Sequence, residues 1–209
     1  MKSLNIVTCF VALLAIMNPV GNIPLFLAMT EGDDAAQRRH TALVTALAVM
    51  ITLSIVAIAG SDILDMFGIT IDDLRIAGGL VVLLIGISML HSETSGIHNS
   101  AAETEEGRKK ASAAIVPLAI PLTAGPGAMA TVIVYAKAAT SALEYGAIAG
   151  AIAAASLATY LAFRAGTAVQ RALGVAGVNI MVRIMGLLLA SIAVGMIGTG
   201  LKGVFPALG

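Results

Sequence analysis

The sequence has little charge, one cysteine and no tryptophan. Only 11% of its 209 residues are Asp, Glu, Lys or Arg, whereas 58% are hydrophobic and the mean hydropathy is +0.97. A soluble domain of this size carries far more charged surface. The 12 basic and 12 acidic residues cancel, and no basic cluster is interleaved with aromatics, so a nucleic-acid partner is not expected. The composition is typical of a protein whose partner is the lipid bilayer.

Residues that carry catalysis or bind metal are also scarce. Cys9 is alone, which excludes an internal disulfide and a thiol relay. His91 and His98 lack the spacing of metal ligands. The apolar segments contain no nucleophile with a base and no metal-ligand set, so an intramembrane enzyme is not expected. We predict no catalytic residue, no metal and no cofactor.

Charged residues bracket six uncharged segments. These segments are 3–30, 41–61, 76–90, 111–136, 145–163 and 184–201. About 20 helical residues cross a hydrocarbon core, so the 15-residue segment 76–90 must draw in upstream residues such as Arg75. Polar connections are expected at Thr30–His40 and Ser61–Leu74. The pattern predicts an all-α membrane protein with six transmembrane helices in one domain, residues 1–209.

Two of these segments are long and interrupted by helix breakers. The first contains Asn18–Pro24 and the second contains Pro121–Gly127. Prolines remove backbone donors and glycines weaken helices, and in hydrocarbon the freed groups need protein, water or ligand as partners. We therefore predict that helices 1 and 4 are broken near the membrane midplane. The helix-breaking prolines are Pro19, Pro24, Pro121 and Pro126.

The two halves of the chain look like repeats. A slide of 108 residues puts Arg75-Ile76-Ala77-Gly78 over Arg183-Ile184-Met185-Gly186, and a slide of 107 puts Pro19 on Pro126. This offset predicts a three-helix unit used twice, in residues 1–90 and 113–209, joined by a linker at 91–112. Because three spans is an odd number, the second copy enters the membrane from the opposite face, and the repeat is inverted.

Basic residues set the predicted orientation. With the N-terminus outside, the cytoplasmic connections hold seven basic residues and the outer ones hold four. The seven are Arg38, Arg39, Arg108, Lys109, Lys110, Arg164 and Arg171, with Arg183 at that border, and the four are Lys2, Arg75, Lys137 and Lys202. We predict a cytoplasmic linker at 91–112 and both termini outside.

Three motifs, taken in order, resemble the MarC family of small prokaryotic inner-membrane proteins, within the wider lysine-exporter-like superfamily. They are Asn18-Pro19-Val20-Gly21-Asn22-Ile23-Pro24-Leu25-Phe26, Arg75-Ile76-Ala77-Gly78-Gly79 and Ile120-Pro121-Leu122-Thr123-Ala124-Gly125-Pro126-Gly127-Ala128. The resemblance covers most of the chain. It implies six spans, an inner-membrane location and a role in moving small neutral amino acids such as glycine and alanine. Asp72-Asp73 departs from the less acidic approach to the arginine motif that we expect.

The interruptions are the predicted binding site for a small zwitterion. Half-helix N-termini offer N–H groups to a carboxylate, and unwound carbonyls accept from an ammonium group. The predicted substrate-binding residues are Asn18, Gly21, Asn22, Thr123, Gly125 and Gly127. The alternative is that both interruptions are packing kinks, since prolines and glycines are common in membrane helices.

Arg75 and Arg183 are the predicted supporting residues at the borders of their segments. They would pair with acidic neighbours or with the carbonyl ends of the broken helices, and ordinary snorkelling to the interface is the alternative. The Ala- and Gly-rich segment 145–163 is interpreted as a packing face. Tyr135 and Tyr160 either anchor at an interface or line a path.

The leading functional prediction is a membrane transporter of small neutral amino acids, secondary in mechanism and with import or export left open. The alternative is a non-transporting assembly or regulatory subunit. No charged residue lies inside the six segments, so a coupling ion, proton or sodium, would use carbonyls, hydroxyls or border residues. The sequence does not select the ion or the oligomeric state.

Overall fold

The computed structural model describes residues 6–91 and 114–205, which form helices and short connections with no strand among them. The elements are α1 (Ile6–Met17), α2 (Ile23–Met29), α3 (Ala35–Phe67), α4 (Ile71–His91), η1 (Ala114–Thr123), α6 (Pro126–Ala138) and α7 (Ala142–Val204). The long α7 is two helices, Ala142–Gly174 and Ala176–Val204, because Gly174 has φ 66° and ψ 179°. The all-α class is confirmed. Except for His91, the predicted linker 91–112 lies outside the described residues.

Four helices are long and apolar enough to cross a membrane. They are Ala35–Phe67, Ile71–His91, Ala142–Gly174 and Ala176–Val204. A fifth crossing results if Pro117–Thr123 and Pro126–Ala138, which meet at a bend of 58°, form one broken span. α1 and α2 contain 12 and 7 residues, so neither is long enough to cross alone.

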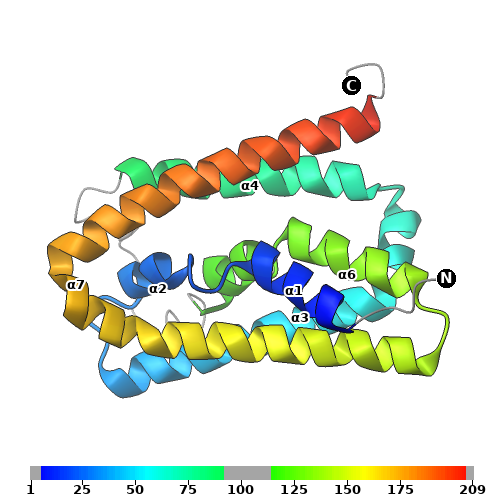
Figure 1. Cartoon of the computed structure of the whole chain (residues 1–209). Coiled ribbons are helices and arrows are strands. Elements are labelled where there is room, and N and C mark those ends of the chain that lie inside the picture. The colour runs from blue at the N-terminus through cyan, green and yellow to red at the C-terminus, as the bar shows by residue number, and fades with distance from the viewer. Residues whose placement is uncertain (1–5, 92–113, 206–209) are drawn as a thin grey trace, which may run out of the picture.

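The successive helices run back and forth along one long axis (Figure 1). α1 and α2 lead away from one end, α3 returns to it, and α4 leads away again. η1 and α6 return, and the two halves of α7 complete a further pair of passes. We call the end that contains Ile6, Phe67 and Val204 the termini end. The opposite end, which contains Met29, His91 and Gly174, is the bend end.

Local capping extends α3 beyond the uncharged segment that predicts it. Asp34 caps its start: the Gln37 N–H donates to Asp34 Oδ1 at 2.8 Å, and the Asp34 N–H donates to Gln37 Oε1 at 3.1 Å. Gly68, in the left-handed conformation at φ 65°, ends the helix. Most of Thr30–His40 and Ser61–Leu74 is therefore helical, and the predicted polar connections are wrong in extent. Charged residues are tolerated in helical turns that project beyond the hydrocarbon, so they do not mark helix ends.

The buried apolar residues form two clusters at different levels of the bundle. One contains Cys9, Leu13 and Met17 of α1 with residues of α3, α6 and the first half of α7, toward the termini end. The other contains residues of α2, α4 and η1 with both halves of α7, toward the bend end. The interrupted segments lie where one cluster gives way to the other.

Glycines let α4 and the second half of α7 pack closely. A Cβ atom added at Gly86 would lie 2.8 Å from the Gly186 carbonyl oxygen, and one at Gly79 would lie 3.0 Å from the Ala193 carbonyl oxygen. Seven residues forward along α4 thus correspond to seven residues back along α7, as in antiparallel helices with a heptad seam. The two helices are therefore antiparallel along this seam.

Candidate functional site

The first interruption, residues 18–22, is closed by its own asparagines. The Asn22 side-chain amide donates to the Met17 carbonyl at 2.9 Å, and the Gly21 N–H donates to Asn18 Oδ1 at 3.2 Å. Asn18 itself has a positive φ of 42°, a conformation that asparagine tolerates better than most residues. Of the last carbonyl groups of α1, those of Leu14 and Met17 are therefore paired.

The second interruption is closed differently. η1 is a π-helix, in which bonds reach back five residues: the Ala124 N–H donates to the Ala119 carbonyl at 2.7 Å. The Thr123 hydroxyl makes a similar bond to the Leu118 carbonyl at 2.7 Å. Gly125, with extended backbone at φ −76° and ψ 177°, then precedes α6. Only Ala124 and Gly125 separate the two helices.

The predicted helix-breaking prolines occupy three different environments. Pro24 and Pro126 lie in the first turns of α2 and α6, where a missing N–H leaves no bond unmade. Pro121 lies inside η1. Pro19 is the one within a non-helical stretch, and it is buried. Two of the four prolines therefore start helices and do not break them.

The glycines of the interruptions differ in how closely other atoms approach. A Cβ atom at Gly125 would overlap the backbone carbonyl oxygen of Pro121. At Gly21 it would overlap the side chain of Asn18, and at Gly127 it would meet only Ile16 Cγ2, at 3.0 Å. Gly125 is the position where the backbone itself requires glycine.

The two interruptions lie close together in the centre of the bundle (Figure 1). Gly127, at the start of α6, lies against Ile16 at the end of α1. Met17 also shares a buried cluster with Ala124 and Ala128. The structure thus brings the end of the first half-helix beside the start of the last one.

The start of α6 presents free backbone donors to this region. The Met129 N–H donates to the Gly125 carbonyl at 2.9 Å, which begins the helical ladder. The N–H groups of Gly127 and Ala128, in the turn before it, have no intrahelical acceptor by helix geometry. Asn22, Thr123 and Ala124 are 3%, 1% and 0% exposed. The central region is therefore shielded from the surface.

Arg75 and Arg183 lie in different surroundings. Arg75 Nη1 donates to Asp72 Oδ1 at 2.6 Å, with 35% and 29% of the two side chains exposed. Three residues further along α4, Gly78 packs so closely on the Pro126 ring that an added Cβ would overlap it. Arg183 is exposed on α7. Arg75 is thus one helical turn from a contact with the second interruption, whereas Arg183 has no comparable contact.

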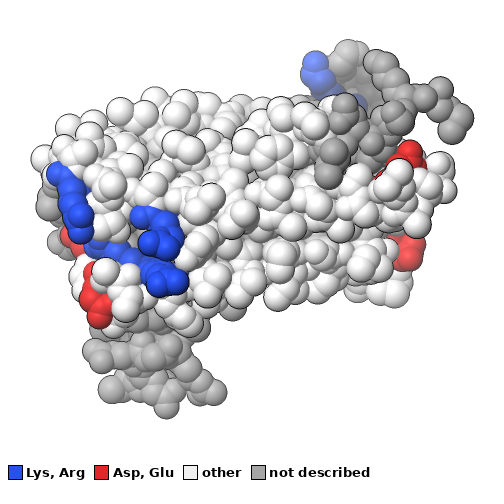
Figure 2. Space-filling model, turned by 60° about the horizontal axis from the view of Figure 1, so that its bottom comes forward, with Lys and Arg blue, Asp and Glu red and all other residues white. Residues whose placement is uncertain are grey.

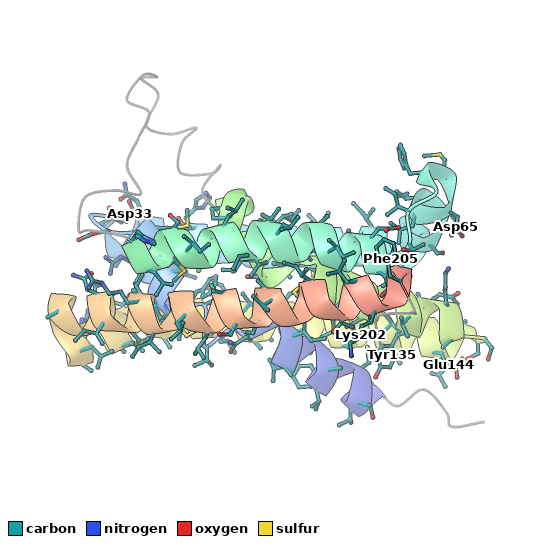
Figure 3. The ribbon with its side chains drawn as sticks, turned by 90° about the horizontal axis from the view of Figure 1, so that it is seen from above. Asp33, Asp65, Tyr135, Glu144, Lys202 and Phe205 are labelled. Carbon is teal, nitrogen blue, oxygen red and sulfur yellow. The ribbon has the colours of Figure 1, made fainter. Side chains whose placement is uncertain are left out.

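Basic side chains gather at the bend end (Figure 2). Arg38 and Arg39 lie on the first turns of α3, and Arg164 and Arg171 on α7. Arg38 donates to Gln170 and to the Thr30 carbonyl, and Arg164 lies 5.9 Å from the ring centre of Tyr160. Tyr135, Glu144 and Lys202 all lie toward the termini end (Figure 3). The two tyrosines therefore lie toward opposite ends.

Sequence reasoning missed two participants. Gly78 belongs to the motif after Arg75, but nothing in the sequence shows its contact with Pro126. Ser156 lies in the segment interpreted as a packing face, and its buried hydroxyl has no hydrogen-bond partner among the residues that the structure describes. An isolated serine in an alanine-rich helix is the only signal, and it is a weak one. Within residues 6–91 and 114–205, no three His, Cys, Asp or Glu residues group as metal ligands.

The fold and site define an all-helical integral membrane protein with two interrupted segments at its centre. The chain belongs to the MarC family: the family model, described as MarC family integral membrane protein, matches residues 4–205.

Curated relatives extend across bacteria and archaea. The UPF0056 membrane protein YvbG of Bacillus subtilis is 39% identical over 206 residues, 97% of each chain. The UPF0056 membrane protein YhcE of Escherichia coli is 41% identical over 199 residues, covering 95% of this chain and 93% of the relative. A UPF0056 membrane protein of Pyrococcus abyssi is 34% identical over 196 residues, 94% of each chain. No solved structure matches the chain significantly.

Proposed function

We propose that the chain is a transporter of small neutral amino acids, with its substrate site where the two interrupted segments meet. The observation that carries the proposal is the contact between the start of α6 and the end of α1, at Gly127 and Ile16. Interrupted helices whose ends meet in the middle of a membrane domain are how many transporters expose backbone groups to a substrate. The family resemblance supports the same substrate class.

The proposed architecture is six spans arranged as two inverted three-helix repeats. α1 and α2 together form the first span, and η1 and α6 form the fourth. The support comes from the alternating helix directions (Figure 1) and from the antiparallel packing of α4 on the second half of α7, at Gly86 and Gly186. An inverted repeat requires its third and sixth helices to cross the membrane in opposite directions.

The chemistry of the site favours a neutral substrate. The N–H groups of Gly127 and Ala128 suit a carboxylate, and carbonyl groups at the end of α1 suit an ammonium group. No ionised side chain belongs to either interruption, so an acidic or basic side chain of a substrate would find no partner.

Purified protein in lipid vesicles tests the proposal. We expect accumulation of labelled glycine and alanine in protein-containing vesicles but not in empty ones, and little accumulation of lysine or glutamate. Imposed proton and sodium gradients, applied separately, identify the coupling ion. If no gradient drives uptake and no amino acid exchanges, the chain is not a carrier, and the non-transporting assembly or regulatory subunit becomes the better description.

We also propose that the bend end faces the cytoplasm of a prokaryotic cell and that both termini lie outside the inner membrane. The basic residues at that end support this orientation (Figure 2). Two exposed alanines give matched probes: Ala36 at the bend end and Ala142 at the termini end. In a Cys9→Ser background, an impermeant thiol reagent applied to intact cells should label Ala142→Cys and spare Ala36→Cys. The reverse pattern contradicts the orientation.

A further inference from the structure

Within the described residues, Ser156 Oγ is the one fully buried side-chain oxygen or nitrogen without a hydrogen-bond partner. Six other hydroxyls donate to the carbonyl four residues earlier, at distances from 2.7 to 3.1 Å. They are Thr30, Thr45, Thr131, Thr159, Ser191 and Thr199. Such back-bonding is the usual way in which a hydroxyl is satisfied in an apolar helix. Ser156 is 3% exposed, and its Oγ has no partner within the described part of the chain.

The position of Ser156 along α7 is fixed by its neighbours. Before it, Ile152 and Ala155 belong to the buried cluster that includes Met17 at the end of α1. After it, the Phe163 ring stacks on Phe26 of α2, with ring centres 4.6 Å apart. Ser156 shares a buried stripe with Ile152 and Phe163, at spacings of four and seven residues. It therefore lies opposite the interruption between α1 and α2.

The same level of the bundle contains the start of α6. Ala155, next to Ser156, shares a buried cluster with Ala124 and Ala128. The N–H groups of Gly127 and Ala128 lie at that helix start and lack intrahelical acceptors. A buried hydroxyl without a partner and free backbone donors, both bordering one buried cluster, form a set suited to a carboxylate.

An unpartnered buried hydroxyl is unfavourable in the empty protein, because it has lost water and gained no bond. A local bond to the Ile152 carbonyl would remove that penalty, as the six other hydroxyls show. In this structure Ser156 does not make that bond, so its hydroxyl is left available to a bound group.

We infer that the Ser156 hydroxyl donates a hydrogen bond to the carboxylate of the transported amino acid, together with the N–H groups at the start of α6. This inference rests on the proposed function and assigns a further substrate-contacting residue to the same site. It identifies the ligand class as a small molecule with a free carboxylate, and it makes Ser156 a residue that distinguishes an acid from its amide.

Calorimetry on purified protein tests the inference with two probes, glycine and glycinamide. The wild type should bind glycine more tightly than glycinamide. Ser156→Ala should weaken glycine binding by about 10-fold to 100-fold, the loss expected for one hydrogen bond to a charged group. Glycinamide binding should change little. Ser191→Ala is the matched control, since Ser191 is an exposed serine of α7 whose hydroxyl bonds to the Leu187 carbonyl.

The outcomes separate the inference from the proposed function. If the wild type binds glycine and Ser156→Ala binds it equally well, Ser156 is a structural residue and the inference fails alone. Equal loss of glycine and glycinamide also contradicts a carboxylate contact. If the wild type binds no amino acid, the proposed function fails and the inference fails with it.

A second variant keeps the test decisive if Ser156→Ala does not accumulate in the membrane. Ser156→Cys, in a Cys9→Ser background, nearly preserves the volume but replaces the hydroxyl by a weak donor. It should also weaken glycine binding, and glycine should slow its reaction with a membrane-permeant maleimide. Glycinamide at the same concentration should protect less. Equal protection by the two compounds contradicts the assignment.

Discussion

Between Met17 and Ile23 the chain leaves helical geometry for five residues, whereas between Thr123 and Pro126 it leaves it for two. The longer interruption has backbone bonds from Asn22 to Asn18 and from Ile23 to Val20, and it adds two bonds made by asparagine side chains. The shorter one is closed by backbone bonds that reach back five residues and by a threonine hydroxyl. The two interruptions thus differ in the side chains that satisfy their open backbone groups.

The two interruptions also differ in the atoms that pack against them. Atoms near Gly21 belong to the movable Asn18 side chain, whereas those near Gly125 are the Pro121 carbonyl. The second interruption is further held by the contact of Pro126 with Gly78 of α4. Gly186, which the offset of 108 between Arg75 and Arg183 aligns with Gly78, packs on Gly86 and Met89 of α4 and not on the first interruption. The second interruption is therefore the more tightly constrained, and the first has more freedom to adjust around a substrate.

The largest expected effect comes from adding one methyl group at Gly125. In Gly125→Ala the new Cβ would overlap the Pro121 carbonyl oxygen within the same segment, and moving helices apart cannot relieve this clash. We expect a loss of about 3 kcal/mol in stability, at the upper end for overpacking, and loss of glycine binding. Thermal unfolding in detergent and calorimetry would measure both.

Gly21→Ala is the matched variant at the first interruption. Its Cβ would meet the Asn18 side chain, which can rotate away, so we expect a smaller loss of about 1 kcal/mol, the lower end for overpacking. If Gly21→Ala proves as damaging as Gly125→Ala, the two interruptions are equally rigid and the comparison is wrong.

A second effect should appear where α4 touches the second interruption. In Gly78→Ala the Cβ would overlap the Pro126 ring, but a small shift of α4 can relieve it, so we expect a loss of about 2 kcal/mol. Gly166→Ala, beside α2, provides the contrast. Its Cβ would make ordinary contacts of 3.4 to 3.5 Å with Leu27, Ile23 and Phe26, and alanine favours a helix.

Gly166→Ala should therefore unfold at the same temperature as the wild type or a higher one. The unfolding midpoints of Gly78→Ala, Gly166→Ala and the wild type, measured in the same detergent, test both expectations. A stable Gly78→Ala protein would show that the contact with Pro126 does not hold the second interruption in place.

The sequence predicts the class of the fold because the bilayer restricts where charged residues and prolines can occur. Charged residues are excluded from hydrocarbon, so they outline the membrane segments, and the structure has apolar helices or half-helices in each of them. Helix ends are predicted less well, since Asp34 and Gly68 terminate α3 by capping and not by polarity. The short segment 76–90 belongs to a helix that begins at Ile71, upstream of Arg75, as its length requires.

The site is only partly predictable, because its parts come from distant segments. Proline and glycine locate the two interruptions, but they do not reveal that the first is closed by asparagine amides or that the second is a π-helix. The contact of Gly78 with Pro126 and the position of Ser156 depend on helix packing, which a single sequence does not encode in any local pattern. Pro24 and Pro126 show the same limit, since a proline that starts a helix and one that breaks it look alike.

A smaller effect is expected from removing the side chains that close each interruption. Asn22→Ala would leave the buried Met17 carbonyl without its amide donor, at about 1–3 kcal/mol. Thr123→Val, nearly the same in shape, would leave the Leu118 carbonyl without its hydroxyl donor, at about 1 kcal/mol. Unfolding midpoints would rank the two. If Thr123→Val is the more destabilising, the backbone bonds of η1 do not support the second interruption as proposed.

Substitutions of Arg75 and Arg183, the two arginines aligned by the offset of 108, should have the smallest effect on stability. They also give the sharpest test of the difference between the two halves of the chain. A partly exposed pair such as Arg75 with Asp72 contributes about 0–1 kcal/mol, and Arg183 is exposed, so neither Arg75→Gln nor Arg183→Gln should lower the unfolding midpoint appreciably. Their effects on transport should differ. Arg75 lies one turn from Gly78, which packs on Pro126, whereas the atoms nearest to Gly186, three residues after Arg183, belong to α4.

We therefore expect Arg75→Gln to slow glycine uptake in vesicles and Arg183→Gln to leave it near the wild-type rate, with the exposed Arg171→Gln as control. Asp72→Asn, which removes the partner of Arg75, should reproduce the Arg75→Gln defect if the ion pair is what positions α4. Equal slowing by Arg75→Gln and Arg183→Gln would mean that both arginines act on the site as the repeat predicts. Uptake unchanged in both would assign them to the membrane interface, where a long basic side chain reaches the headgroups without taking part in transport.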